Sequence, residues 1–177
     1  MLFLMAVTGG AFAQRNIAGA GIGAMIGTPY TGGLEVFASY EFFIIPQFSL
    51  GANLTCQLYP LVAATVIFGP IVGLNEKYSA FTYIAEGQVH WYPHAKTFHV
   101  DLGVGYANYL SNMRALLIAP GFGWTFYAKP PKGFLVNFSF RGEVFMPLSG
   151  FVFEPNENGS FIPFNILTVQ AALGYRF

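Results

Sequence analysis

The chain has 177 residues, of which 54% are hydrophobic, 18% are aromatic and only 9% are charged. Soluble domains carry about 25% charged residues, so this composition excludes an ordinary water-soluble domain. Eight basic and eight acidic residues cancel, and the basic ones are scattered, which excludes the basic surface that nucleic-acid binding needs. The single cysteine, Cys56, excludes an intrachain disulfide. A membrane protein is the class that remains.

The first residues have the pattern of a secretory leader. Residues 2–7 form a short apolar run, and Ala11-Phe12-Ala13 before Gln14 follows the small-x-small rule of signal-peptidase sites. We therefore predict a signal peptide over residues 1–13 and an exported domain over residues 14–177. The alternative interpretation of this segment is the buried first strand of a cytosolic domain.

The rest of the chain favours strands over helices as the membrane-spanning element. A spanning helix needs about 18 consecutive apolar residues, and the longest candidate, residues 61–74, is interrupted by Gly69-Pro70. Apolar and polar residues instead alternate with period two, as in residues 48–59, and no helix has that period. Because lipid cannot hydrogen-bond an open sheet edge, such strands must close into a barrel.

Counting the alternating segments gives eight strands and an all-β fold, an eight-stranded antiparallel transmembrane β-barrel. The predicted strands cover residues 17–27, 33–43, 48–59, 80–92, 97–109, 115–128, 134–147 and 164–177. The short connections 44–47, 93–96 and 129–133 are expected on one side, and the long connections 60–79 and 148–163 on the other. Both termini are then periplasmic.

One residue does not fit: Pro120, on an outward row of the sixth strand, removes a backbone donor, and the sequence offers no reason for it.

Aromatic residues recur on outward positions beside the predicted periplasmic turns and at the C-terminus. They are Phe42, Phe48, Trp91, Phe98, Phe126, Phe134, Tyr175 and Phe177. The last strand ends in Tyr175 and Phe177, with Leu173, Ala171 and Val169 at alternate positions before them. With the leader and the alternating strands, this ending resembles small bacterial outer-membrane barrels of the OmpA-domain, OmpX and OmpW kind. The resemblance implies a bacterial outer-membrane location, and it implies that Tyr175 and Phe177 are the signal read by the barrel-assembly machinery.

The inward rows hold the residues with which a lumen could act. Glu86 and Arg141 fall near mid-height, with Glu143 slightly to the extracellular side, and we predict that these three form a polar cluster in the lumen. Inner-row glycines leave space there; they are Gly19, Gly21, Gly23, Gly103, Gly105, Gly121, Gly123 and Gly174. Two interpretations follow: an ionic plug, which an interior of this width favours, or a narrow polar conduit. A conduit would prefer cations, because five inward acids face two arginines; the seven are Glu35, Glu41, Glu86, Asp101, Glu143, Arg141 and Arg176.

Catalytic, cofactor and metal motifs are not expected. His90, His94 and His99 surround one predicted turn, but their spacing has no metal signature, so solvated turn histidines are favoured over a metal site. There is no G-x-S-x-G motif and no histidine near the predicted extracellular rim, so we predict that the protein is not an enzyme and binds no cofactor.

Two functions remain from different classes. Resemblance to the OmpW kind implies a narrow channel for small or hydrophobic solutes. The alternative, implied by resemblance to the OmpX kind, is a non-conducting surface barrel whose connections 60–79 and 148–163 bind a host or envelope partner. The other expected partners are outer-membrane lipid and the assembly machinery, and no nucleic acid is expected.

Overall fold

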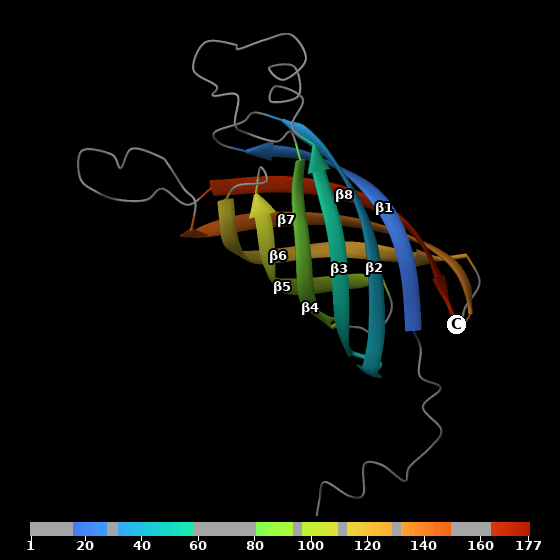
Figure 1. Ribbon diagram of the computed structural model, residues 1–177. Coiled ribbons are helices and arrows are strands. Elements are labelled where there is room, and N and C mark those ends of the chain that lie inside the picture. Colours follow the sequence, from blue (N-terminus) through green and yellow to red (C-terminus); the bar gives the residue numbers. More distant parts are fainter. Residues whose placement is uncertain are drawn as a thin grey trace, which may run out of the picture.

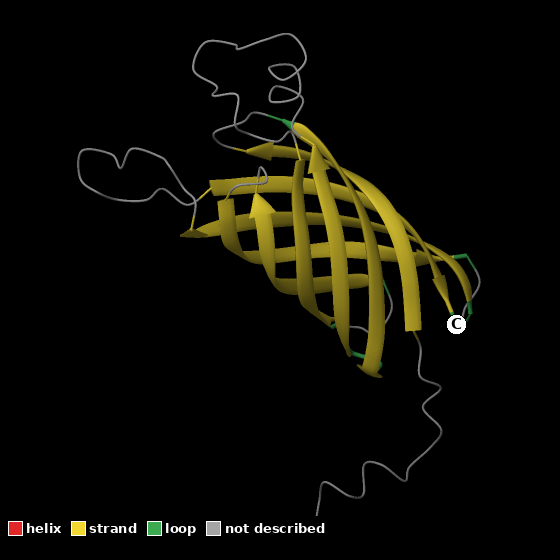
Figure 2. Cartoon of the chain, viewed as in Figure 1, coloured by secondary structure: helices red, strands yellow, loops and turns green. Residues whose placement is uncertain are grey.

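Each strand in a lipid-facing wall must pair its backbone on both sides, because hydrocarbon offers no hydrogen bonds. Eight antiparallel strands meet this condition here by closing into a barrel (Figure 1), and the described chain is built from strands and short turns (Figure 2). The computed structural model describes residues 16–27, 32–58, 81–93, 97–109, 113–128, 132–149 and 164–177. Its strands are β1 (Asn16–Gly27), β2 (Gly33–Ile45), β3 (Phe48–Leu58), β4 (Phe81–Trp91), β5 (Phe98–Tyr109), β6 (Met113–Tyr127), β7 (Gly133–Ser149) and β8 (Phe164–Arg176). Within these ranges no helix is long and apolar enough to cross a bilayer.

The barrel closes between its first and last strands. β1 and β8 pair continuously from Ile17 opposite Arg176 to Gly27 opposite Ile166. Asn16 and Phe177 extend this seam, since each donates its backbone N–H to the other's carbonyl, at 3.3 Å and 3.1 Å. Both described termini therefore lie at one end of the barrel, which we name the termini end; the opposite end is the loop end.

All eight predicted strands are present, and the predicted fold class is confirmed. Their boundaries differ by a few residues: β2 continues to Ile45, and β6 begins at Met113. β7 also runs to Ser149, so the first two residues of the predicted connection 148–163 belong to a strand. The predicted leader, residues 1–13, and the connection 60–79 lie outside the described residues.

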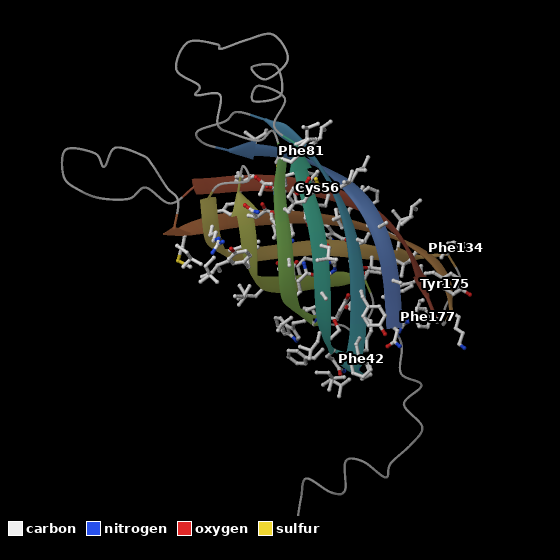
Figure 3. The ribbon with its side chains drawn as sticks, in the orientation of Figure 1. Phe42, Cys56, Phe81, Phe134, Tyr175 and Phe177 are labelled. Carbon is white, nitrogen blue, oxygen red and sulfur yellow. The ribbon has the colours of Figure 1, made fainter. Side chains whose placement is uncertain are left out.

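The two faces of the wall differ as the alternation predicts. In β3, the outward Leu54 is 65% exposed, whereas its inward neighbour Asn53 is 3% exposed. Large apolar side chains are exposed on every strand, which forms a continuous apolar surface far larger than soluble proteins tolerate. Aromatic side chains lie outside the barrel near the termini end, where the rings of Phe134 and Tyr175 are 5.3 Å apart (Figure 3). The outer wall is thus suited to lipid and not to water.

A charge placed on this wall tests that conclusion. Leu54 lies at mid-length of β3, whereas Leu34 lies at the loop end of β2 and is 59% exposed. We expect Leu54→Arg to lower the free energy of unfolding by about 2–4 kcal/mol and Leu34→Arg by about 0–1 kcal/mol, because the cost of a charge rises toward the middle of the bilayer. Urea unfolding in lipid vesicles measures both, and equal small effects at the two positions would contradict a lipid-facing wall.

Candidate functional site

The interior of the barrel is filled by inward side chains arranged in layers. At the loop end, an apolar cap is formed by Ile84, Leu117, Phe145 and Ile166, all of which are buried. These residues come from β4, β6, β7 and β8, so the cap spans the lumen from several sides. Eight strands enclose a width that side chains just fill, and this cap does so with hydrocarbon.

Below the cap lies an acid-amide layer made of Glu35, Gln57, Glu143 and Gln170. The Gln57 side-chain amide donates from Nε2 to Glu143 Oε2 at 2.7 Å and to Glu35 Oε2 at 3.3 Å. Gln170 Nε2 donates to the other oxygen of Glu35 at 2.7 Å, and Gln170 accepts a bond from Ser139 at 3.0 Å. One amide therefore bridges two buried carboxylates, and it joins β2, β3 and β7 across the lumen.

An ion-pair layer lies next, formed by Arg141, Glu86 and Asp101. The Arg141 guanidinium donates to both carboxylate oxygens of Glu86, from Nη1 at 3.1 Å and from Nη2, and its Nε lies 3.3 Å from Asp101 Oδ1. The side chains of Arg141 and Glu86 are only 3% and 2% exposed. Because β4 and β7 are not neighbours, this pair crosses the lumen. A bidentate arginine–carboxylate pair of this kind is among the stronger hydrogen-bonded contacts that a buried charge can make.

The predicted cluster is therefore divided between two layers. Glu86 and Arg141 are in direct contact, whereas the hydrogen-bond partner of Glu143 is Gln57 and not Arg141. The alternation identified these residues as inward, and it placed Gln57 and Gln170 on inner rows as well. It gave no sign that the two amides connect the acids.

Inner-row glycines mark where the crossing side chains run. A Cβ added to Gly103 would overlap the Glu86 carboxylate, and one added to Gly121 would lie 2.7 Å from Asp101 Oδ2 and 2.9 Å from Arg141 Cγ. Both distances are too short for a real Cβ contact. The space that these glycines leave is thus occupied by the ion-pair layer, which is the structural basis for a plug.

Toward the termini end, a hydrogen-bonded group surrounds Glu41. Ser49 and Tyr92 both donate their hydroxyls to Glu41 Oε1, the second at 2.7 Å, and His90 Nδ1 lies 3.6 Å from the same oxygen. The ring of Tyr92 is 5.3 Å from that of His99. His90 and His99 are only 9% and 2% exposed, so their interpretation as solvated turn histidines is wrong. They lie on the inner rows of paired strands, and the barrel wall buries them.

His94 lies outside the described residues. Within the part of the chain that the structure describes, no group of three or more His, Cys, Asp or Glu side chains is arranged to hold a metal ion.

Aromatic rings and an arginine form a floor at the termini end. The Arg176 guanidinium lies over the rings of Phe43 and Tyr127, at 5.4 Å and 5.0 Å from their centroids. Phe43 in turn contacts the ring of Tyr92, with 5.4 Å between centroids. Cations and aromatic faces attract each other, so this floor is held by cation–π contacts as well as by packing.

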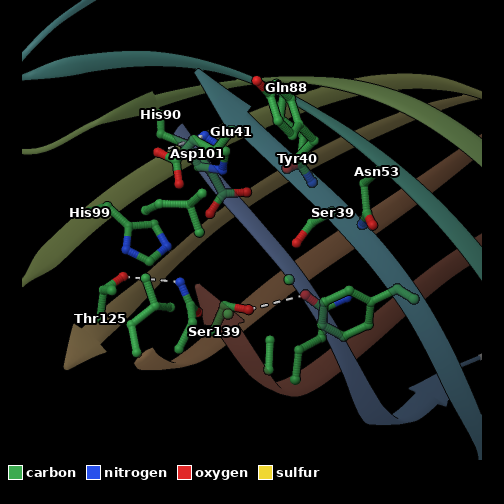
Figure 4. Close-up of a pocket in the computed structure, with 18 of the residues that line it drawn as sticks. Ser39, Tyr40, Glu41, Asn53, Gln88, His90, His99, Asp101, Thr125 and Ser139 are labelled. Atoms are coloured by element: carbon green, nitrogen blue, oxygen red, sulfur yellow. Dashed lines mark hydrogen bonds and ion pairs between the residues drawn. The ribbon is translucent and has the colours of Figure 1, made fainter. Parts of the chain in front are cut away.

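Between the floor and the ion-pair layer lies a small cavity of about 70 Å³, lined by both polar and apolar side chains. Figure 4 shows Ser39, Asn53, Gln88, His99 and Asp101 around it. The Asn53 amide oxygen and His99 Nδ1 are buried there without a protein partner. A cavity of this size has room for a few water molecules, which would satisfy such atoms.

No protein-family model matches the chain, and no curated protein matches it. Solved structures do match. Neisserial surface protein A is 10% identical, with a TM-score of 0.55 over 95% of this chain and 99% of that one. Ail of Yersinia pestis is 8% identical, with a TM-score of 0.49 over 93% of this chain and 99% of that one, and it has also been solved with the heparin analogue sucrose octasulfate. The monoaromatic hydrocarbon channel CymD is 13% identical, with a TM-score of 0.35 over 82% of this chain and 36% of that one.

Removing Arg141 tests whether the ion-pair layer behaves as a unit. Arg141→Met leaves Glu86 and Asp101 buried without their cation, so we expect the free energy of unfolding to fall by about 3–5 kcal/mol. Neutralising all three, with Glu86→Gln, Asp101→Asn and Arg141→Met together, is expected to recover most of this loss, because no uncompensated charge remains. Urea unfolding in vesicles measures both variants. A loss below about 1 kcal/mol for Arg141→Met would show that the layer is not a coupled buried cluster.

The likeness to neisserial surface protein A agrees with the barrel architecture, and the apolar outer wall suits a membrane. The chain is a small eight-stranded antiparallel barrel of the bacterial outer-membrane type.

Proposed function

We propose that this protein is a non-conducting barrel of the outer membrane that displays its long connections at the cell surface, where they bind a host or envelope partner. The observation that carries the proposal is the Arg141–Glu86 ion pair, which crosses the lumen at mid-height. The apolar cap lies on one side of this pair, and the aromatic floor lies on the other. A solute would have to displace the apolar cap, the ion pair and the aromatic floor in order to pass.

The orientation in the proposal follows from the lengths of the connections. At the termini end, strands are joined by short segments, such as Pro46-Gln47 between β2 and β3. At the loop end, β3 and β4 are separated by residues 59–80, and β7 and β8 by residues 150–163. Barrels of this type place short turns in the periplasm and long loops outside. The termini are then periplasmic, and the long connections reach the surface, where loops on a rigid scaffold serve recognition.

The termini end also holds the residues proposed as the assembly signal. Tyr175 and Phe177 are both exposed on the outer wall. Their outward position on the wall supports the proposal that the assembly machinery reads them.

A second function, a narrow channel, is favoured by one observation: the cavity below Arg141. The inward acids outnumber the inward arginines, so such a channel would prefer cations. The cavity is lined by apolar side chains such as Ile17 and Leu135 as well as polar ones such as Asn53, so its lining suits small solutes of either kind.

Planar-bilayer recording separates the two functions. We expect the refolded protein to give no steady unitary conductance, because the cap, the ion-pair layer and the floor each close the lumen. Bilayers without protein are the baseline. A steady cation-selective conductance that Gly103→Leu abolishes would refute the non-conducting barrel and establish the channel.

The recognition part of the proposal is tested on the loops. We expect fluorescent vesicles carrying the barrel to bind specific spots on an array of host glycans and matrix proteins. Replacing residues 61–72 with a short Gly-Ser turn, or residues 151–162 in the same way, should remove that binding. The mobility difference between boiled and unboiled samples on a gel should remain, because the barrel itself is unchanged. Binding that survives both replacements would contradict a role for these connections.

A further inference from the structure

Pro120 leaves one backbone carbonyl of the wall without a donor. The pairing of β5 with β6 is unbroken through Leu102 opposite Pro120, so the side on which proline lacks an N–H faces β7. There the pairs stop at Ile118 opposite Val144 and resume in the same register at Gly121 opposite Arg141. This register places Pro120 opposite Gly142, whose carbonyl therefore finds no N–H on β6.

A hollow on the outer wall lies over the same point. It measures about 520 Å³ and extends across β6, β7, β8 and β1. Its outward lining is apolar and consists of Ala24, Ile26, Pro120, Phe122, Phe140, Leu167 and Val169. Gly142 forms its floor, and an added Cβ there would meet only Leu167 Cδ2, at 3.9 Å. The volume is in the range of small-molecule sites.

The walls of the hollow suit a hydrocarbon chain. Phe122 and Phe140 stack with 5.5 Å between centroids and 19° between planes, which gives a flat wall on one side. Ile26 and Leu167, which are 70% and 69% exposed, form the other side. Gly142 lies in the middle part of β7, so the hollow is continuous with the lipid-facing surface at hydrocarbon depth.

An unpaired carbonyl at this depth calls for a donor from the membrane. Water is absent from the hydrocarbon region, so an unsatisfied backbone group is strongly unfavourable there. We propose that the hollow binds the acyl chain of a membrane lipid that carries a hydroxyl group. The chain lies against Ile26, Leu167 and the phenyl rings, and the hydroxyl donates to the Gly142 carbonyl.

The test compares two neutral probes that differ by one oxygen, methyl 3-hydroxytetradecanoate and methyl tetradecanoate. Each is added to the refolded barrel in detergent, and bound probe is measured by native mass spectrometry. We expect the hydroxylated ester to bind about fivefold more tightly, as one hydrogen bond allows. Gly142→Leu, which fills the hollow, should remove binding of both esters. Gly87→Leu is the matched control, because Gly87 is an exposed glycine of the outer wall on β4, where an added Cβ would meet only the Val104 carbonyl oxygen, at 3.9 Å.

Pro120→Ala isolates the hydrogen bond from the shape of the hollow. The new N–H can pair with the Gly142 carbonyl, so the variant should still bind both esters but lose the preference for the hydroxylated one. Gel mobility with and without boiling verifies that each variant is folded. Equal binding of the two esters to the wild type, unchanged binding to Gly142→Leu, or a preference retained by Pro120→Ala would each overturn the proposal.

Discussion

The buried guanidinium of Arg141 is the charge around which the interior of the barrel is arranged. An isolated cation inside so narrow a wall would cost far more than folding can supply, so carboxylates must reach it. Glu86 does so from across the lumen, and Asp101 from β5. Their side chains fit only because Gly103 and Gly121 present no Cβ on the inner wall. One charge thus dictates residue choice on four strands, and its ion pairs extend across the lumen.

The strands and their faces were predictable because lipid leaves few alternatives. Alternation with period two identified Leu54 as outward and Asn53 as inward, and the structure has them so. Contacts across the lumen were not predictable in this way, because period two fixes the direction of a side chain and not its reach. Glu143 bonds to Gln57, 86 residues away in sequence. His90 shows a related effect: it lies near a turn, but its inward position on a paired strand decides its burial.

Pro120 is a second case in which the sequence of a strand does not reveal the contact that its neighbouring strand makes. Within its own strand, proline is only a missing donor, and the sequence gives no reason for it. The register of β6 and β7 places it opposite Gly142, a residue with no side chain to cover the unpaired carbonyl. Together, Pro120 and Gly142 leave one backbone carbonyl unpaired beneath an apolar hollow. Neither residue has this property by itself.

The seam between β1 and β8 has a consequence for how the protein folds. It joins residues at the two ends of the chain, such as Ile17 and Arg176, so it has the greatest sequence separation of any pairing in the barrel. Contacts of this kind form slowly, because a long loop must close before they are gained. Until then β1 and β8 are edge strands, with rows of free N–H and C=O groups that invite pairing with other chains. The open sheet is therefore the aggregation-prone species during folding, because both of its edges stay unpaired until β1 meets β8.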